Sequence, residues 1–282
     1  MPTPKALGHQ RVTRKHVVRS APMSSQVTLE RDGHVAILSF DDRARRNAMT
    51  PELGDALAAR VAEVAVDQSV RAVVLTGAGG AFSAGGDLGM LERLRTVNAR
   101  EAETFMRAFY ARYLSITTLT VPTIAAIEGP AIGAGFCVAL ACDLRIVDES
   151  AKLALNFASL GLHPGMGATY LAPLRAGAER GLELLLTGRR FDGREAAAMG
   201  MALAAVPASE VRTRAVALAH QISHAAPLAI RGILRTARLD RGALEHALAH
   251  EAREQATSYA SADLGEGLKA ASEKRSAVFT GR

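Results

Sequence analysis

Two short turns rich in glycine and alanine are the segments of this chain where backbone atoms could take part in chemistry. The first is AFSAGGDL at residues 81–88, and the second is GPAIGAG at residues 129–135. Each follows an apolar run and precedes a predicted helix, and small side chains there would let a ligand approach the backbone closely. A helix that begins near Gly133 would present free N–H groups at its positive end. Two such turns could direct two N–H donors at one developing oxyanion.

Tight packing is the alternative explanation for these glycines, and it accounts for either turn taken singly. The second turn does not match the phosphate-binding pattern G-x-G-x-x-G, because its glycines are spaced differently. The chemical interpretation therefore depends on the presence of both turns in one chain.

The elements that must position these turns follow from the hydrophobic pattern. Strands are predicted over residues 35–40, 71–77, 123–127, 143–147 and 152–156. Helices are predicted over residues 51–67, 100–118 and 133–142, and again across residues 169–199. Short apolar strands that alternate with helices indicate an α/β fold with parallel strands and covering helices. Only helical patterns remain in residues 208–282, which are expected to form a separate helical region.

The positive charge of the chain is concentrated at its N-terminus. The formal net charge is +6, and residues 1–22 contain five Lys or Arg residues and no acidic residue, so residues 23–282 carry only about +1. We interpret residues 1–22 as a disordered basic extension. The rest of the chain shows no interleaved basic and aromatic surface of the kind that binds nucleic acid.

The remaining composition favours a cytoplasmic protein without a metal or a membrane anchor. No apolar run is long enough to span a membrane, and the N-terminal segment lacks the apolar stretch of a secretory signal. Cys137 and Cys142 lie five residues apart in one apolar run, where a disulfide on a helix is geometrically unfavourable. No spacing of cysteine and histidine suggests a metal site.

The ordered set of motifs resembles the crotonase (enoyl-CoA hydratase/isomerase) superfamily across residues 27–282. The resemblance is carried by both turns and by shorter motifs, namely RNA at 46–48, CD at 142–143, PGMG at 164–167, LTG at 186–188, EG at 266–267 and EKR at 273–275. It implies a crotonase-like spiral of ββα units over residues 23–207, which holds the acyl-CoA site. It also implies that residues 208–282 drive assembly into a homotrimer or a dimer of trimers.

The resemblance also assigns roles to individual residues. The substrate would be an acyl-CoA thioester, so that coenzyme A enters as part of the substrate and no separate cofactor is needed. The oxyanion-hole N–H groups would be those of Ala84 and Ala134. Contacts to coenzyme A would come from Arg45, Arg46, Ala48, Ala84, Gly85, Gly86, Asp87 and Leu88. The acyl pocket would be formed by Phe136, Phe157, Leu160 and Met166.

Two positions depart from the family pattern in a way that affects the reaction. A typical hydratase uses two glutamates as acid and base, and these positions hold Cys137 and Phe157 in this chain. Neither side chain replaces a carboxylate, and a cysteine acts as a base or nucleophile only when its pKa is lowered. His163 is the nearest other titratable residue, and it could serve as a general base. The alternative is that His163 bonds to the backbone within its turn.

Three functional hypotheses remain open at this point. The first is an enoyl-CoA hydratase/isomerase-family enzyme that stabilises a thioester enolate in the oxyanion hole. The second is another reaction on the same scaffold, either decarboxylation of a malonyl-type thioester or thioester hydrolysis assisted by His163 or Cys137. The third is an acyl-CoA-binding protein without catalytic activity.

Overall fold

The central element of the fold is a six-stranded sheet that is parallel except at one edge. The structure, a computed structural model, describes residues 26–282, so the predicted N-terminal extension lies outside the described residues. The strand order is β1-β2-β3-β4-β6-β9, with an antiparallel β1–β2 pair. These strands are β1 (Gln26–Asp32), β2 (Val35–Asp41), β3 (Ala72–Gly77), β4 (Thr123–Ile127), β6 (Leu144–Asp148) and β9 (Ala204–Val206).

A smaller three-stranded sheet lies beside the first. It contains β5 (Ala131–Ile132), β7 (Leu153–Ala154) and β8 (Arg190–Phe191), and β5 pairs with β7 in parallel. Because β5 belongs to the second glycine-rich turn, this sheet fixes the backbone just before the helix that follows.

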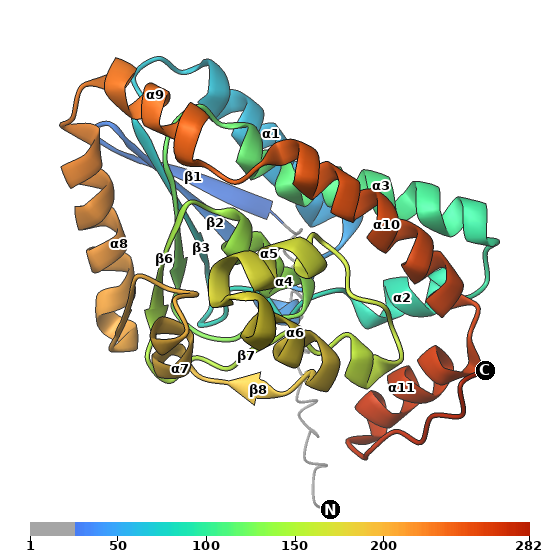
Figure 1. Cartoon of the computed structure of the whole chain (residues 1–282). Coiled ribbons are helices and arrows are strands. Elements are labelled where there is room, and N and C mark those ends of the chain that lie inside the picture. The colour runs from blue at the N-terminus through green and yellow to red at the C-terminus, as the bar shows by residue number, and fades with distance from the viewer. Residues whose placement is uncertain (1–25) are drawn as a thin grey trace, which may run out of the picture.

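Helices cover both faces of the large sheet, as Figure 1 shows. Helix α8 packs on β3, β4 and β6 on one face, while α1 and α4 belong to the larger hydrophobic core on the other. The helices are α1 (Pro51–Val66), α2 (Leu88–Leu94), α3 (Ala99–Leu114), α4 (Ala134–Ala141), α5 (Ala168–Ala176), α6 (Ala178–Thr187), α7 (Gly193–Ala198), α8 (Ala208–Ser223), α9 (Pro227–Ala237), α10 (Arg241–Tyr259) and α11 (Ala262–Glu273).

The predicted helical region at residues 208–282 is present as α8 to α11. Helix α10 runs along α3, and α11 folds back so that it contacts α2 and the 3-10 turn at Ala158–Leu160 (Figure 1). The C-terminal region therefore packs directly on the ββα core. None of the helices within residues 26–282 is long and apolar enough to cross a membrane.

The predicted helix over residues 100–118 ends earlier than expected. Helix α3 stops at Leu114, and residues Ser115–Thr118 form a 3-10 turn. The hydroxyls of Ser115, Thr117 and Thr118 each donate to a carbonyl three residues back, at 2.7–2.8 Å. Such side-chain bonds compete with the α-helical ladder, so this run of hydroxyl residues tightens the last turn.

Candidate active site

The two glycine-rich turns lie side by side and are joined through their backbones. The N–H groups of Phe82 and Ser83 donate to the Pro130 carbonyl at 3.0 and 3.1 Å, and the Ile132 N–H donates to the Ser83 carbonyl at 3.0 Å. The turns are more than forty residues apart in the sequence, so the parallel sheet is what brings them together. The predicted convergence of the two turns is therefore present in the fold.

Two glycines permit this close approach. A Cβ atom at Gly135 would lie 2.6 Å from both the Cβ and the Oγ of Ser83, so α4 could not pack this closely on the first turn with any larger residue. Gly85 has a φ of +87°, and a Cβ atom there would lie 2.6 Å from the carbonyl oxygen of Ile132. Both positions require glycine because a Cβ atom there would clash with the opposite turn.

A cavity of about 210 Å³ opens where the turns meet. Ala84, Gly86 and Ala134 all line it, together with an apolar wall that includes Phe157, Leu160 and Met166. Helix α11 contributes Ala271 to the same wall. The structure thus places a largely apolar chamber directly against the two backbone turns.

The predicted oxyanion donor at Ala84 is not supported by the structure. The Ala84 N–H donates to the carbonyl oxygen of Arg46 at 2.9 Å, so it is already used within the protein. The neighbouring N–H of Gly86 is different. Met49 and Gly86 form a parallel bridge in which the Gly85 carbonyl and the Asp87 N–H both bond to Met49. Because successive peptide groups of an extended chain point in opposite directions, the Gly86 N–H faces away from Met49.

The second predicted donor, Ala134, remains available. Ala134 is the first residue of α4, so its N–H has no partner within the helix. The N-cap residue is Gly133, which has no side chain to cap the helix, and its own N–H donates to the Ala154 carbonyl at 2.8 Å. Among the hydrogen bonds of the described residues, none engages the N–H of Ala134 or of Gly86.

Asn47 and Ser83 hold the first turn in place. The Asn47 side chain is fully buried, and its amide donates to the carbonyls of Ala78 and Ala81 at 3.0 and 2.8 Å. The backbone carbonyl of Asn47 in turn accepts a hydrogen bond from the Ser83 Oγ at 2.7 Å. Ser83 therefore bonds to the protein instead of facing the cavity.

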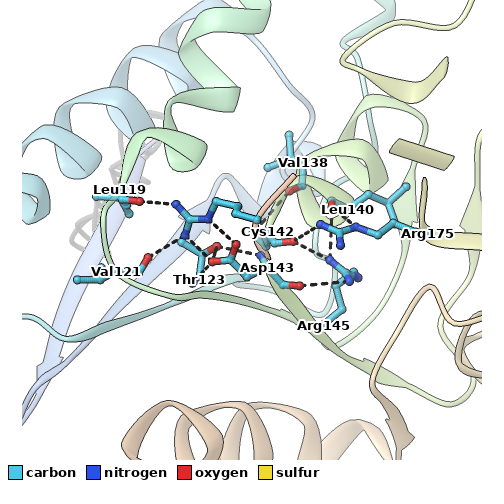
Figure 2. A network of polar contacts seen from close by, with 10 residues as sticks. Leu119, Val121, Thr123, Val138, Leu140, Cys142, Asp143, Arg145 and Arg175 are labelled. Atoms are coloured by element: carbon cyan, nitrogen blue, oxygen red, sulfur yellow. Dashed lines mark hydrogen bonds and ion pairs between the residues drawn. The ribbon is translucent and has the colours of Figure 1, made fainter. Parts of the chain in front are cut away.

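The opposite end of α4 is fixed by arginines. Figure 2 shows Arg145 and Arg175 converging on the carbonyl groups of Leu140 and Cys142 at the end of the helix. Arg145 donates to the Cys142 carbonyl at 2.7 Å, and Arg175 donates to the Leu140 and Cys142 carbonyls at 3.2 Å each. Burial lowers the pKa of Arg145 to about 10, which leaves it charged at neutral pH. Cations at the negative end of α4 stabilise the helix whose other end carries Ala134.

Cys137 and Phe136 lie outside the cavity. Both residues are buried within α4, and Phe136 packs edge-to-face on Phe191 with the ring centroids 5.6 Å apart, so its predicted place in the acyl pocket is wrong. Burial, aided by the nearby Glu251 charge, raises the pKa of the Cys137 thiol far above its usual value. A thiol in this state is neither a base nor a nucleophile, so Cys137-assisted hydrolysis is not supported.

His163 also lies away from the cavity walls. Its Nδ1 is 2.7 Å from the Pro164 carbonyl oxygen, and its own backbone carbonyl accepts a hydrogen bond from Gln255 at 2.9 Å. This geometry matches the alternative interpretation of a histidine that bonds to backbone within its turn. It does not support a general base at this position.

The predicted coenzyme A residues occupy two different settings. Ala84, Gly85, Gly86 and Leu88 line the cavity, whereas Asp87 caps α2 by accepting the Met90 N–H at 2.8 Å. Arg45, Arg46 and Ala48 lie next to the turn, outside the cavity walls. The Arg45 guanidinium pairs with Asp42 at 2.8 Å, and the Arg46 backbone contacts Ala84.

Besides Asn156, three polar residues on helices line the cavity, and they carry no motif in the sequence. They are Tyr110 from α3 and Gln255 and Tyr259 from α10, and the Tyr110 hydroxyl donates to Gln255 Oε1 at 2.7 Å. Helices α3 and α10 are far apart in the chain, and a single sequence offers no pattern that pairs them. No group of three or more His, Cys, Asp or Glu side chains suited to a metal ion occurs in residues 26–282. Both cysteines are free.

Comparison with known proteins agrees with this architecture. Residues 30–282 match the family model for enoyl-CoA hydratase/isomerase. A putative enoyl-CoA hydratase of Thermus thermophilus is 37% identical over 253 residues, which cover 88% of this chain and 98% of the relative. The crystal structure of EchA1_1 from Mycobacterium paratuberculosis superposes with a TM-score of 0.80 at 32% identity, covering 93% of this chain and all of the other.

A second solved structure leads to the same conclusion. It is an enoyl-CoA hydratase/isomerase from Pseudoalteromonas atlantica, which has a TM-score of 0.79 and 27% identity and covers 90% of this chain and all of its own. The match extends from the ββα core into the C-terminal helices. The chain is therefore a member of the enoyl-CoA hydratase/isomerase family, with the crotonase fold.

Proposed function

We propose that the protein binds an acyl-CoA thioester and stabilises its enolate with the N–H groups of Gly86 and Ala134. The observation that carries this proposal is that both groups border one cavity and neither has a partner within the described residues. Gly86 thereby takes the place that the sequence assigned to Ala84.

The chemistry follows from where negative charge develops. Breaking a bond at the carbon next to a thioester carbonyl leaves an electron pair that moves onto the carbonyl oxygen. Two fixed N–H donors stabilise that oxyanion without reorganisation, and each such donor contributes roughly 10²- to 10³-fold in rate. Buried surroundings strengthen the effect because the local dielectric is low.

Coenzyme A would reach the cavity along the exposed rim beside Arg46. The backbone of Arg46 is bonded to Ala84, so its side chain starts at the mouth of the first turn. Guanidinium groups suit phosphate oxygens, so Arg46 would supply positive charge at this rim, while Arg45 would contribute from its ion pair with Asp42.

Decarboxylation of a malonyl-type thioester is the reaction that the cavity favours. None of the described residues that line the cavity is Asp, Glu, Lys, Arg or His, whereas adding water to an enoyl group requires an acid and a base. In decarboxylation the bond to the carboxylate carbon breaks, carbon dioxide leaves, and the electron pair becomes the enolate. Water then supplies the proton. An apolar wall without a cation destabilises the substrate carboxylate more than the delocalised enolate.

Turnover of three thioesters tests the reaction class. Crotonyl-CoA reports hydration through loss of its conjugated absorbance, while malonyl-CoA and methylmalonyl-CoA report decarboxylation through release of carbon dioxide. We expect release of carbon dioxide from at least one malonyl-type thioester, and hydration only at the background rate. Rapid hydration of crotonyl-CoA would contradict the decarboxylase assignment, and binding of all three without turnover would favour a non-catalytic acyl-CoA-binding protein.

The oxyanion assignment has its own test in Ala134→Pro. Proline removes the N–H and is well tolerated at the first position of a helix, so the substitution deletes the donor with little effect on α4. We expect kcat to fall by roughly 10²- to 10³-fold. Ala178→Pro is the matched control, because Ala178 is exposed at the first position of α6 and also follows a glycine N-cap. Equal activity of both variants would refute a role for the Ala134 N–H.

A further inference from the structure

Asn156 is the polar side chain of the cavity wall that has no partner among the described residues. It lies between β7 and the 3-10 turn at Ala158–Leu160, it is half-buried, and it lines the cavity. No hydrogen bond within residues 26–282 involves its side chain. A side-chain amide carries two N–H donors and an acceptor oxygen, so the bonding capacity of Asn156 is available to a molecule in the cavity.

The other polar side chains of the wall are already engaged. The Tyr110 hydroxyl donates to Oε1 of Gln255 at 2.7 Å, and the Gln255 amide donates to the His163 carbonyl at 2.9 Å. The Tyr259 hydroxyl has two acceptors, at 3.3 and 3.5 Å. Among the polar side chains that line the cavity in the described part of the chain, Asn156 is therefore the one that can bind a small polar molecule without breaking an existing bond.

The amide of Asn156 borders the residue that precedes the proposed oxyanion donor. A Cβ atom built at Gly133 would lie 3.4 Å from Oδ1 of Asn156 and 3.8 Å from the Phe157 ring. Gly133 is followed directly by Ala134, whose N–H faces the same cavity in the proposed function. The Asn156 amide thus lies at the end of the cavity where the thioester carbonyl would be held.

The backbone on both sides of Asn156 is fixed, so its amide has a defined place. Ala154 pairs with Ile132 in the small sheet, and its carbonyl accepts the Gly133 N–H at 2.8 Å. A Cβ atom built at Gly188 would lie 3.2 Å from the Asn156 Cα, so the segment after α6 packs closely against this residue.

We propose that Asn156 is a further catalytic residue, whose amide holds the water molecule that protonates the enolate. Loss of carbon dioxide leaves an electron pair at the carbon next to the thioester. One O–H bond of the water then breaks, a C–H bond forms at that carbon, and the remaining hydroxide combines with carbon dioxide to give bicarbonate. An amide does not transfer a proton itself at neutral pH, but it holds a water through its oxygen and its N–H groups.

This proposal rests on the proposed decarboxylation and adds the source of the proton to it. The cavity wall offers no acidic or basic side chain among the described residues, so a positioned water is the remaining proton donor. A water held beside the carbon reacts faster than one that must diffuse in, because its orientation is already set. The enolate is therefore protonated before carbon dioxide can add back to it.

Carbon isotope exchange measures this competition. The malonyl-type thioester that the protein turns over is incubated with ¹³C-bicarbonate, and mass spectrometry follows ¹³C in the unreacted substrate against the decarboxylated product. We expect less than about one exchange per ten turnovers in the unmodified protein, and a ratio roughly tenfold higher in Asn156→Leu. Leucine has nearly the shape of asparagine but no hydrogen-bonding group. Asn156→Ala takes its place if the leucine variant does not fold.

Ser159→Ala is the matched control. Ser159 lies three residues further along the same segment, is exposed, and is outside the cavity walls, so its ratio of exchange to turnover should not change. An unchanged ratio in a folded Asn156 variant would overturn the inference and leave the proposed function intact. So would loss of both exchange and turnover, because the amide would then act before the enolate forms. Absence of decarboxylation in the unmodified protein would overturn both.

Discussion

At the scale of single residues, Gly135 and Gly86 differ in the space available for an added methyl group. A methyl group at Gly135 would lie 2.6 Å from Ser83, whereas one at Gly86 would meet only the methyl groups of Leu91 at 3.9 Å. Both changes keep every backbone N–H. The pair therefore separates the spacing of the two turns from the chemistry of the donors.

We predict that Gly135→Ala abolishes most activity while Gly86→Ala retains it. The alanine at position 135 must push α4 away from the first turn, which moves the Ala134 N–H out of reach of a bound oxyanion. A shift of about 1 Å is enough to cost 10²-fold in rate. Thermal unfolding and steady-state kinetics of both variants check this. Retained activity in Gly135→Ala would show that the turns can separate without loss of function.

The sequence predicts the two turns but not which N–H of the first turn is free. Residue types and spacing mark residues 81–88 as a turn that approaches a ligand. The choice between Ala84 and Gly86 depends on the bridge between Gly86 and Met49, and on the bond from Ala84 to Arg46. Arg46 and Met49 belong to the loop between β2 and α1. A single sequence does not reveal which residues of this loop pair with residues 84–87.

At the scale of elements, Glu251 joins α10 to the beginning of α5. Its carboxylate is fully buried and accepts the N–H groups of Gly167 and Thr169 at 2.7 and 2.8 Å and the Thr169 hydroxyl at 2.7 Å. These bonds satisfy the free N–H groups at the positive end of α5. Burial nevertheless dominates and raises the pKa of Glu251 to about 7, against the lowering effect of the three hydrogen bonds.

This raised pKa predicts that the folded state becomes less stable as the pH rises through the slightly acidic range. The folded protein holds the Glu251 proton up to a pH near 7, whereas the unfolded chain releases it near 4.5. The stabilisation is complete below pH 4.5 and is lost as the pH approaches 7, by about 3 kcal/mol. Urea unfolding at several pH values between 5 and 8 measures the slope.

Glu251→Gln removes the titrating proton and should flatten this slope, whatever its effect on absolute stability. Glu254→Gln is the control, because Glu254 is exposed on the same helix. An unfolding free energy with the same pH dependence in the unmodified protein and in Glu251→Gln would contradict this account.

The hydrophobic pattern predicts best the elements that lie in continuous apolar runs. The strands β2, β3, β4 and β6 and the helices α1 and α4 follow apolar runs in the sequence, and each is present near its predicted bounds. The strands β5, β8 and β9 contain only two or three residues, which is too short for a periodic pattern. Their pairing is set by tertiary contacts. Of the second sheet, only β7 is predicted, within the longer strand expected over residues 152–156.

At the scale of the whole molecule, the C-terminal helices leave apolar surface uncovered. Helix α9 has no buried residue, and Leu228 and Ile233 on it are 78% and 57% exposed. Ile230 on the same helix borders a groove that also contains Ile222 of α8. Exposed apolar side chains on a surface helix indicate a protein contact, which fits the expected assembly of the chain into trimers.

We predict that light scattering will give a mass of three or six chains, each of 29.7 kDa. Leu228→Asp combined with Ile233→Asp should shift the protein to a lower mass, because a buried interface cannot accommodate two unpaired carboxylates. Val66→Asp is the control, since Val66 is 77% exposed at the end of α1 rather than on α9. A monomeric protein in solution, or an unchanged mass in the double variant, would show that α9 is not the interface. If the double variant does dissociate, its activity shows whether a single chain forms a complete cavity. We expect it to remain active, because Ala271 of α11 in the same chain already contributes to the cavity wall.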